Sequence, residues 1–521
     1  MKIGDKDTKK ILNGAMWLGL SAIILKVIGL IYKVPISYLL GDEGMGYFNS
    51  AYTVYSLFYI IGSAGIPKAV SILCAKATPS EAKTVFLVVF RIYMILGIIL
   101  SLILIVFSGP LAALISSKSS AFSIFAIAPS VMFVCASGVL RGYLNGKTRF
   151  IPIAISELIS GMCKLFLGLA LAFLAIKAGF ALPVVCACSI LGITIGSFLG
   201  FIYLYIHYIK ESKSIKREYI QKNKIIREVF KIGLPIAFAA ALSSLVNIID
   251  LSLIMNKLRN AGYSESVSTV IYGNYTTLAV PMFNVITNLL NMIALAALPV
   301  ITKSFSERKY DKVKTSFSSS VNLSMFIAIP SFFLFMFFPY EILSLIFEIG
   351  SATVGAPFLA SLAPAVIFYS ILISANTALE GMGKIKVAVI SLIIGAVVKL
   401  LLSILLIGTD TFGALGAPIS TSVSYLVSCV FSISQLKKDK QLCVNILKIS
   451  EKTLVISVIS LIITILVKYF VNLTYSTRVN SLLVLSVYGV FYIIFSLFST
   501  IIRKRKFVLS AKCTKNEVCD Y

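Results

Sequence analysis

Long apolar segments, separated by short polar breaks, recur along all 521 residues of the chain. An α-helix needs about 20 apolar residues to cross the hydrocarbon core of a bilayer. The pattern therefore predicts an all-α integral membrane protein with fourteen transmembrane helices. Their expected positions are residues 11–33, 46–73, 84–107, 121–140, 151–176, 183–207, 230–256, 271–301, 316–338, 356–379, 386–407, 414–435, 453–471 and 479–502.

The charged residues predict how these helices are oriented. In a soluble protein the net charge of +26 would suggest a nucleic-acid partner, but here only 13% of the residues are charged and 58% are hydrophobic. If the N-terminus is cytoplasmic, 35 of the 47 Lys and Arg residues lie in inner tails and loops, and six lie in outer loops. This excess predicts cytoplasmic termini, a location in the plasma membrane and no nucleic-acid partner.

The sequence also repeats itself once. The segment LNGKTRFIPIAISELISGMCKL (144–165) aligns without gaps to LEGMGKIKVAVISLIIGAVVKL (379–400), and AKTVF (82–86) matches VKTSF (313–317). Each repeat holds six predicted helices, an even number, so both repeats enter the membrane from the same side. We therefore expect two parallel six-helix lobes, 1–220 and 221–440, with a substrate site at their interface. Two extra helices (441–505) and a cytoplasmic tail (506–521) follow.

Six cations fall within the predicted spans, where a charge costs from about 2.5 kcal/mol upward and is by default paired or functional. They are Lys26, Lys33, Lys68, Arg91, Lys164 and Lys399. Lys26, Lys33, Lys164 and Lys399 are the candidates for binding substrate, because their predicted positions are the deeper ones or share a helix face with one. Lys33 could instead extend to the membrane surface. Lys164 could form a structural ion pair with Glu157, seven residues earlier on the same helix face.

Deep polar residues complete the candidate site. Asn284, Asn288 and Asn291 share one face of the span 271–301, where they either line a solvated cavity or pack between helices. Asp250 could face Lys26 or Lys33 across the lobe interface, or it could bind a cation. An interior with more cations than anions suits an anionic substrate, and phosphate or pyrophosphate is the natural choice.

Enzymatic function is not expected. The longest hydrophilic segment, roughly 208–229, is too short for a catalytic domain, and the sequence contains no nucleotide-binding or hydrolase motif. The nine cysteines are scattered, and the one histidine is near neither of the closely spaced pairs of cysteines. We therefore expect no metal site and no cofactor.

Three segments resemble a known family: KVIGLIYKVPISYLLGDEGMGYFNSAYTVYSLFYIIGSAGIPKAVS (26–71), LRGYLNG (140–146) and LEGMGK (379–384). They look like the polysaccharide-transport branch of the multidrug/oligosaccharidyl-lipid/polysaccharide exporter superfamily, and most like stage V sporulation protein B and MurJ-type lipid II flippases. The resemblance implies two V-shaped lobes that work by alternating access. It places Lys26 at the position of an essential cation in the first helix.

The resemblance also implies a coupling ion, Na⁺ or H⁺, with Asp250, Asn376 and Glu380 as candidate ligands. It implies that the last two helices form a groove for a polyprenyl tail. The function expected is a flippase for an undecaprenyl-pyrophosphate-linked oligosaccharide, with the peptidoglycan precursor lipid II as the expected substrate and sporulation as the expected process. The alternatives are an exporter of another lipid-linked polysaccharide unit, a cation-coupled multidrug antiporter, and a non-transporting scaffold for cell-wall synthesis enzymes.

Overall fold

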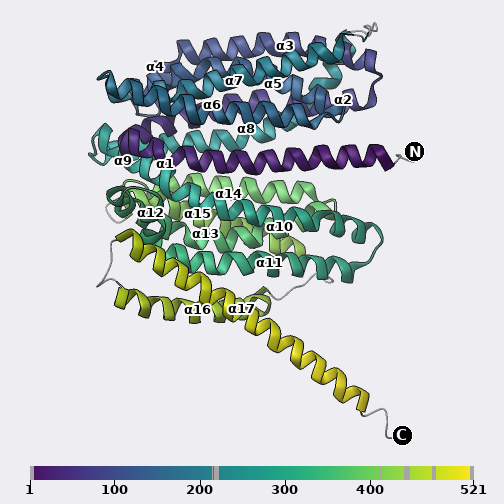
Figure 1. Ribbon diagram of the computed structural model, residues 1–521, viewed down its shortest axis with the longest axis vertical. Coiled ribbons are helices and arrows are strands. Elements are labelled where there is room, and N and C mark those ends of the chain that lie inside the picture. The colour runs from purple at the N-terminus through teal and green to yellow at the C-terminus, as the bar shows by residue number, and fades with distance from the viewer. Residues whose placement is uncertain are drawn as a thin grey trace. The chain divides into compact units, whose positions relative to one another are not determined.

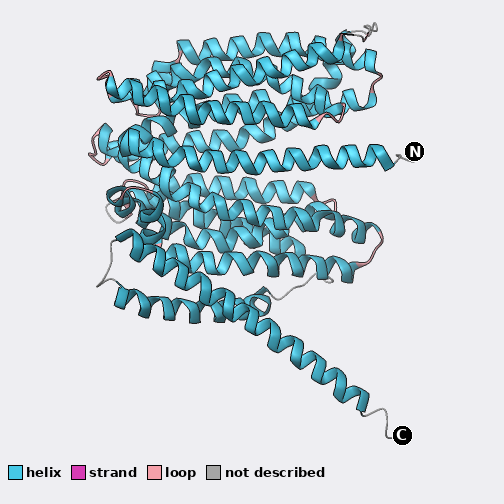
Figure 2. Cartoon of the chain, viewed as in Figure 1, coloured by secondary structure: helices cyan, strands magenta, loops and turns pink. Residues whose placement is uncertain are grey.

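The computed structural model describes residues 5–213, 215, 222–409, 412–438, 446–471 and 477–516. Within these ranges the backbone alone is described for 5–20 and 499–516 and at some further positions, Lys26 among them. Every regular element of the described chain is a helix or helical turn (Figure 2). The predicted all-α class is therefore confirmed.

The chain forms two compact units, Met1–Thr277 and Leu278–Tyr521. The helices of unit 1 are labelled in Figure 1 and have these bounds: α1 (Asp5–Ser63), α2 (Gly65–Lys76), α3 (Pro79–Val106), α4 (Ser108–Leu114), α5 (Ala121–Gly146), α6 (Phe150–Lys177), α7 (Leu182–Ser212), α8 (Lys222–Asn260) and α9 (Glu265–Asn274). A short 3₁₀ turn, η1 (Lys118–Ser120), precedes α5.

Unit 2 follows a π-helical turn, η2 (Tyr275–Ala279), which crosses the boundary between the units. Its helices are α10 (Val280–Ser306), α11 (Tyr310–Phe337), α12 (Pro339–Ile346), α13 (Ile349–Gly381), α14 (Ile385–Leu406), α15 (Gly416–Lys437), α16 (Ile446–Val471) and α17 (Thr477–Asn516). The 3₁₀ turn η3 (Gly413–Leu415) precedes α15. The last helix thus continues past residue 502, where the apolar pattern ends the final span.

Twelve segments of the described chain are long and apolar enough to cross a membrane. The predicted spans 11–33 and 46–73 contribute to one of these segments, Val27–Ala75, and none of the twelve lies in α8, which covers the predicted span 230–256. The other predicted spans each match one segment. The full set of fourteen spans and the orientation of the termini stay predictions.

The first helix is broken at Gly41, which has φ 62° and ψ −176°. A positive φ is accessible to glycine because it has no Cβ. The break falls between the first two predicted apolar segments, as their spacing requires. A second interruption at Ala64 separates α1 from α2, so the predicted helix 46–73 consists of two pieces.

Unit 1 extends beyond the predicted lobe boundary at residue 220, because α8 and α9 pack against α1 and α2. Glycines allow this close approach. A Cβ added at Gly46 of α1 would overlap the backbone carbonyl of Thr269 in α9, and one added at Gly65 would overlap the carbonyl of Gly233 in α8. The compact units therefore differ from the repeat-based lobes, which stay a prediction.

Unit 2 has its core between α11, α13 and α15, where buried apolar side chains such as Phe317, Leu379 and Leu436 pack together. The two extra helices are attached to this unit. Tyr488 of α17 packs with Phe338 near the start of α12, and the Tyr492 hydroxyl donates to the Phe326 carbonyl of α11 at 2.7 Å. The buried carboxylate of Glu341 in α12 pairs with Lys468 of α16.

The contact between α1 and α9 gives a stability prediction. Replacing Gly46 with Ala should lower the stability of the purified protein by about 1–3 kcal/mol, because the added methyl group overpacks the backbone of Thr269. Gly29 is the matched control, since it lies on the same helix and a Cβ there would meet no atom within 4 Å. Thermal unfolding in detergent should give a lower Tm for G46A than for G29A. Equal Tm values would show that α9 does not pack this closely on α1.

Candidate functional site

Lys33 of α1 is half-buried, and its Nζ donates a hydrogen bond to the Thr276 carbonyl oxygen at 3.1 Å. Thr276 belongs to the π-helical turn η2, and such turns often occur at functional sites. The ammonium group is thus held by a backbone dipole from a segment 243 residues away in sequence. This contact argues against a side chain that simply extends to the membrane surface.

Lys164 of α6 is also half-buried, and aromatic rings hold its ammonium group. Its Nζ lies 4.9 Å from the ring centroid of Tyr32 and 5.4 Å from that of Tyr52. A cation over an aromatic face is attracted by the ring quadrupole. Lys164 is also close enough to Lys33 for the two charges to repel each other. Unit 1 therefore contains a pair of interior cations whose described contacts are with neutral groups.

The alternative of a structural ion pair between Lys164 and Glu157 is wrong. Glu157 instead pairs with Arg141 of α5, at 3.3 Å between Oε1 and Nη1. Arg141 lies one position into the LRGYLNG segment, and its long side chain reaches the carboxylate on the neighbouring helix. The physical reason for the error is that spacing on one helix cannot reveal a better partner on another. Lys164 is consequently left for another role.

Aromatic side chains continue from Lys164 along the second half of α1. The rings of Phe48, Tyr52, Tyr55 and Tyr59 follow one another with centroid separations of 6.4, 5.8 and 5.7 Å. Sequence reasoning missed this row. The spacing of four, three and four residues could have identified it, because such residues share one helix face.

Lys399 of α14, in unit 2, is the residue that the sequence repeat aligns with Lys164. It is half-buried and close enough to Tyr425 of α15 for its charge to interact with that side chain. The Tyr425 ring packs at 5.1 Å against Tyr369, whose hydroxyl donates to Asn291 Oδ1 at 3.0 Å. The predicted asparagine row is thus partly used for helix packing at Asn291. The other two members are Asn284, which is exposed, and Asn288, which is half-buried.

The candidate coupling residues lie in different units. Asp250 of α8 is buried in unit 1 and acts electrostatically on Tyr272. Asn376 is buried in unit 2, where its Oδ1 accepts hydrogen bonds from Ser432 at 2.8 Å and from another serine. Glu380, four residues later on α13, is exposed. Their role as a cation site stays a prediction, as does the role of Lys26, whose side chain lies outside the described part.

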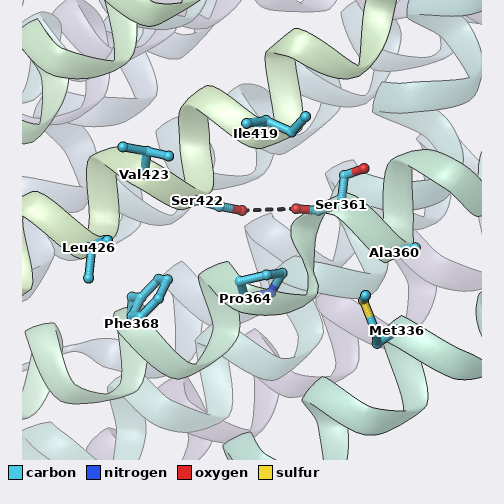
Figure 3. Close-up of a pocket in the computed structure, with 9 residues that line it drawn as sticks. All are labelled: Met336, Ala360, Ser361, Pro364, Phe368, Ile419, Ser422, Val423 and Leu426. Atoms are coloured by element: carbon cyan, nitrogen blue, oxygen red, sulfur yellow. Dashed lines mark hydrogen bonds between the residues drawn. The ribbon is translucent and has the colours of Figure 1, made fainter. Parts of the chain in front are cut away.

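A separate apolar pocket of about 370 Å³ opens between α11, α13 and α15 of unit 2 (Figure 3). Its polar groups are satisfied locally, since the Ser422 hydroxyl donates to the Ser361 carbonyl at 2.9 Å. The pocket is suited to hydrocarbon and not to an anionic group. Its lining residues are Met336, Ala360, Ser361, Pro364, Phe368, Ile419, Ser422, Val423 and Leu426.

The chain matches the models of two known protein families. A family model described as polysaccharide biosynthesis protein matches residues 11–305, more than half of the chain. The chain belongs to this family. A second model, MatE, matches residues 235–405. The resemblance found in the sequence is therefore confirmed at the level of the family.

Among its relatives, the chain is 25% identical to "Lipid II flippase MurJ" of Bacillus subtilis, over 88% of each chain. It is 21% identical to "Stage V sporulation protein B" of the same organism, over 90% of this chain and 91% of the other. With its twelve apolar segments, these relatives identify a multi-pass protein of the bacterial plasma membrane.

Two solved structures show the same fold. One is described as "Lipid II flippase MurJ, inward closed conformation", with a TM-score of 0.74 at 17% identity, covering 94% of this chain and all of that one. The other is an inward-facing multidrug resistance MATE family transporter, with a TM-score of 0.65 at 14% identity, covering 82% and 98% of the two chains. At these identities the likeness establishes the fold alone.

The Arg141–Glu157 pair gives a test of whether Glu157 serves only Arg141 or also the cation site at Lys164. Replacing Glu157 with Gln should cost less than about 1 kcal/mol of stability, because both side chains are more than a quarter exposed. The substitution should leave the contacts of Lys164 intact. Thermal unfolding should show a small fall in Tm, with transport in cells unchanged. Loss of transport with an unchanged Tm would mean that Glu157 serves the cation site after all.

Proposed function

We propose that the protein is a flippase that moves an undecaprenyl-pyrophosphate-linked oligosaccharide from the inner to the outer leaflet of the plasma membrane. The observation that carries this proposal is the pair of interior ammonium groups, Lys33 and Lys164, held by a carbonyl oxygen and by aromatic faces. The names of the relatives, a lipid II flippase and a sporulation protein, support it.

The chemistry of the two lysines fits a pyrophosphate. A lysine ammonium acts as a compact point charge toward phosphate oxygens. A cation already paired with a buried carboxylate would have to lose that strong partner before it could bind a substrate. Lys33 and Lys164 are held by weaker, neutral partners, so an arriving anion can replace or supplement these contacts. The mutual repulsion of the two ammonium groups is relieved when an anion binds between them.

The hydrocarbon part of the substrate needs an apolar surface. In unit 2 the outer faces of α16 and α17 expose Leu466, Leu482, Ile493 and Leu497. A polyprenyl chain can lie on such a surface at no cost in desolvated polar groups. We therefore retain the proposal that these two helices accompany the tail while the cations hold the head group.

The substrate proposed within this class is the peptidoglycan precursor lipid II, and the process proposed is spore formation, by likeness to the two Bacillus relatives. The movement proposed is alternating access of two lobes. A multidrug antiporter is the second candidate, favoured by the MatE match and by the likeness to a multidrug resistance MATE family transporter, but a drug cation would be repelled by Lys33 and Lys164. A scaffold for cell-wall synthesis enzymes would not need interior cations at all.

The lysine pair gives the first functional test. Lys33→Gln and Lys164→Gln should each reduce flipping at least tenfold at normal expression, because each removes one of the two described ammonium groups proposed to hold the pyrophosphate. The measurement is the fraction of undecaprenyl-linked precursor that an externally added enzyme can cleave in cells dependent on this protein. Lys68→Gln is the matched control, since Lys68 is an exposed cation of α2.

Cells whose flippase lacks either lysine should accumulate total precursor, while the fraction of precursor exposed on the outer leaflet falls. Exposure equal to wild type in both glutamine variants would falsify the flippase proposal and favour the scaffold. Normal precursor exposure together with drug sensitivity of the cells would instead favour the antiporter.

The coupling proposal has its own test. If Asp250 binds Na⁺, flipping in vesicles should depend on a Na⁺ gradient, and Asp250→Asn should abolish that dependence because the neutral amide binds the cation more weakly. Asp311→Asn, an exposed acid at the start of α11, should behave as wild type. Na⁺-independent transport by wild type, unchanged in the Asp250 variant, would remove Asp250 from the coupling mechanism.

A further inference from the structure

The row of aromatic residues on the second half of α1, Phe48, Tyr52, Tyr55 and Tyr59, contacts the cation site only at Tyr52 and extends beyond it. Its second and fourth rings are open, whereas its first and third, Phe48 and Tyr55, are buried. Tyr52 is 42% exposed and Tyr59 is 38% exposed, whereas Tyr55 between them is 4% exposed. Tyr55 therefore serves as the packed support that holds two open rings in place.

We expect the face that carries the open rings to be solvated and not lipid-facing. Tyr52 contacts the ammonium group of Lys164, and an ammonium group in hydrocarbon would be strongly unfavourable. Tyr59 lies seven residues further along the same helix, nearly two full turns, and so projects from the same face. The row thus extends from the cation site along a wall that water or a polar ligand can reach.

A neighbouring face of the same helix is already occupied. Asn49 donates to the Thr277 hydroxyl at 2.6 Å, and Thr53 hydrogen-bonds with the Tyr272 hydroxyl at 3.1 Å. These contacts fix the rotation of α1 against α9 and η2. Among the described residues, by contrast, the hydroxyls of Tyr52 and Tyr59 have no hydrogen-bond partner. Two rigid rings with available hydroxyl groups therefore face the solvated side.

We propose that Tyr52 and Tyr59 form a sugar subsite, which binds the pyranose rings of the lipid-linked glycan while Lys33 and Lys164 hold its pyrophosphate. This inference rests on the proposed function and adds to it the residues that recognise the glycan. Tyrosine suits the task because its ring is apolar and its hydroxyl is polar, and a sugar has an apolar C–H face and a polar edge.

The dimensions agree with this assignment. Seven residues rise about 10.5 Å along a helix, which leaves room for two sugar rings in succession, one at Tyr52 and one at Tyr59. The contact of Tyr52 with Lys164 puts the first ring next to the phosphate-binding cations. This is the order of groups in a lipid-linked glycan, where the sugar directly follows the pyrophosphate.

Equilibrium binding to the purified full-length protein in lipid nanodiscs tests the subsite. The probes are undecaprenyl pyrophosphate and the same lipid carrying a disaccharide. Wild type should bind the glycosylated lipid about tenfold more tightly, as expected for an aromatic anchor at a binding site. Tyr59→Ala should reduce this difference, because only Tyr52 is left to contact a sugar ring, and should leave the affinity for undecaprenyl pyrophosphate unchanged.

Three further variants separate a specific contact from a general disturbance. Tyr59→Phe keeps the ring and should retain most of the difference between the two lipids. Phe166→Ala removes a 61% exposed aromatic ring on α6 and should bind both lipids as wild type does. Lys164→Gln should weaken the binding of both lipids together, since it acts on the pyrophosphate.

The outcomes distinguish the two proposals. If undecaprenyl pyrophosphate binds in a Lys164-dependent way but the disaccharide adds no affinity, or Tyr59→Ala keeps the full difference, the sugar subsite is wrong and the flippase proposal stands. If neither lipid binds in a Lys164-dependent way, the proposed function fails, and the subsite fails with it.

Discussion

The constraint on which unit 1 depends is the solvation of ammonium groups inside an apolar fold. Lys33 and Lys164 would each be costly in hydrocarbon, and the structure stabilises them with a carbonyl oxygen of η2 and with tyrosine rings. Neutral partners solve the problem only in part. They lower the cost of the charge enough for the helices to form and pack, while leaving each cation able to bind an anion. A carboxylate partner would have stabilised the fold further and closed the site.

The backbone is shaped to make those contacts possible. Lys164 touches Tyr32 from the first half of α1 and Tyr52 from the second half, so the break at Gly41 brings both rings to one ammonium group. The π-helical turn η2 presents the Thr276 carbonyl to Lys33. The close approach of α9 to α1 at Gly46 holds this turn in place. A local irregularity in each of two helices thus creates the cation site.

The two units use related lysines in different surroundings. Lys164 and Lys399 occupy equivalent positions in the sequence repeat, and each acts on a tyrosine of its own unit. Unit 1 adds a second cation and an aromatic row with two exposed rings, whereas unit 2 adds an asparagine–tyrosine contact, an apolar pocket and the two extra helices. We infer that polar recognition is concentrated in unit 1 and hydrocarbon contact in unit 2.

The sequence by itself determined the all-helical membrane class, the break near residue 41, the family and the lysines to test, because hydrophobic length and the cost of buried charge are properties of single segments. Only the tertiary structure decided which residues contact each charged side chain. Spacing on one helix left a Lys164–Glu157 pair open as an alternative, but in the packed structure Glu157 pairs with Arg141 and tyrosines surround Lys164. The contact between Lys33 and Thr276 joins residues 243 positions apart, and no local pattern encodes it. Which residues surround a charge depends on how distant helices meet, and that is a property of the packed chain.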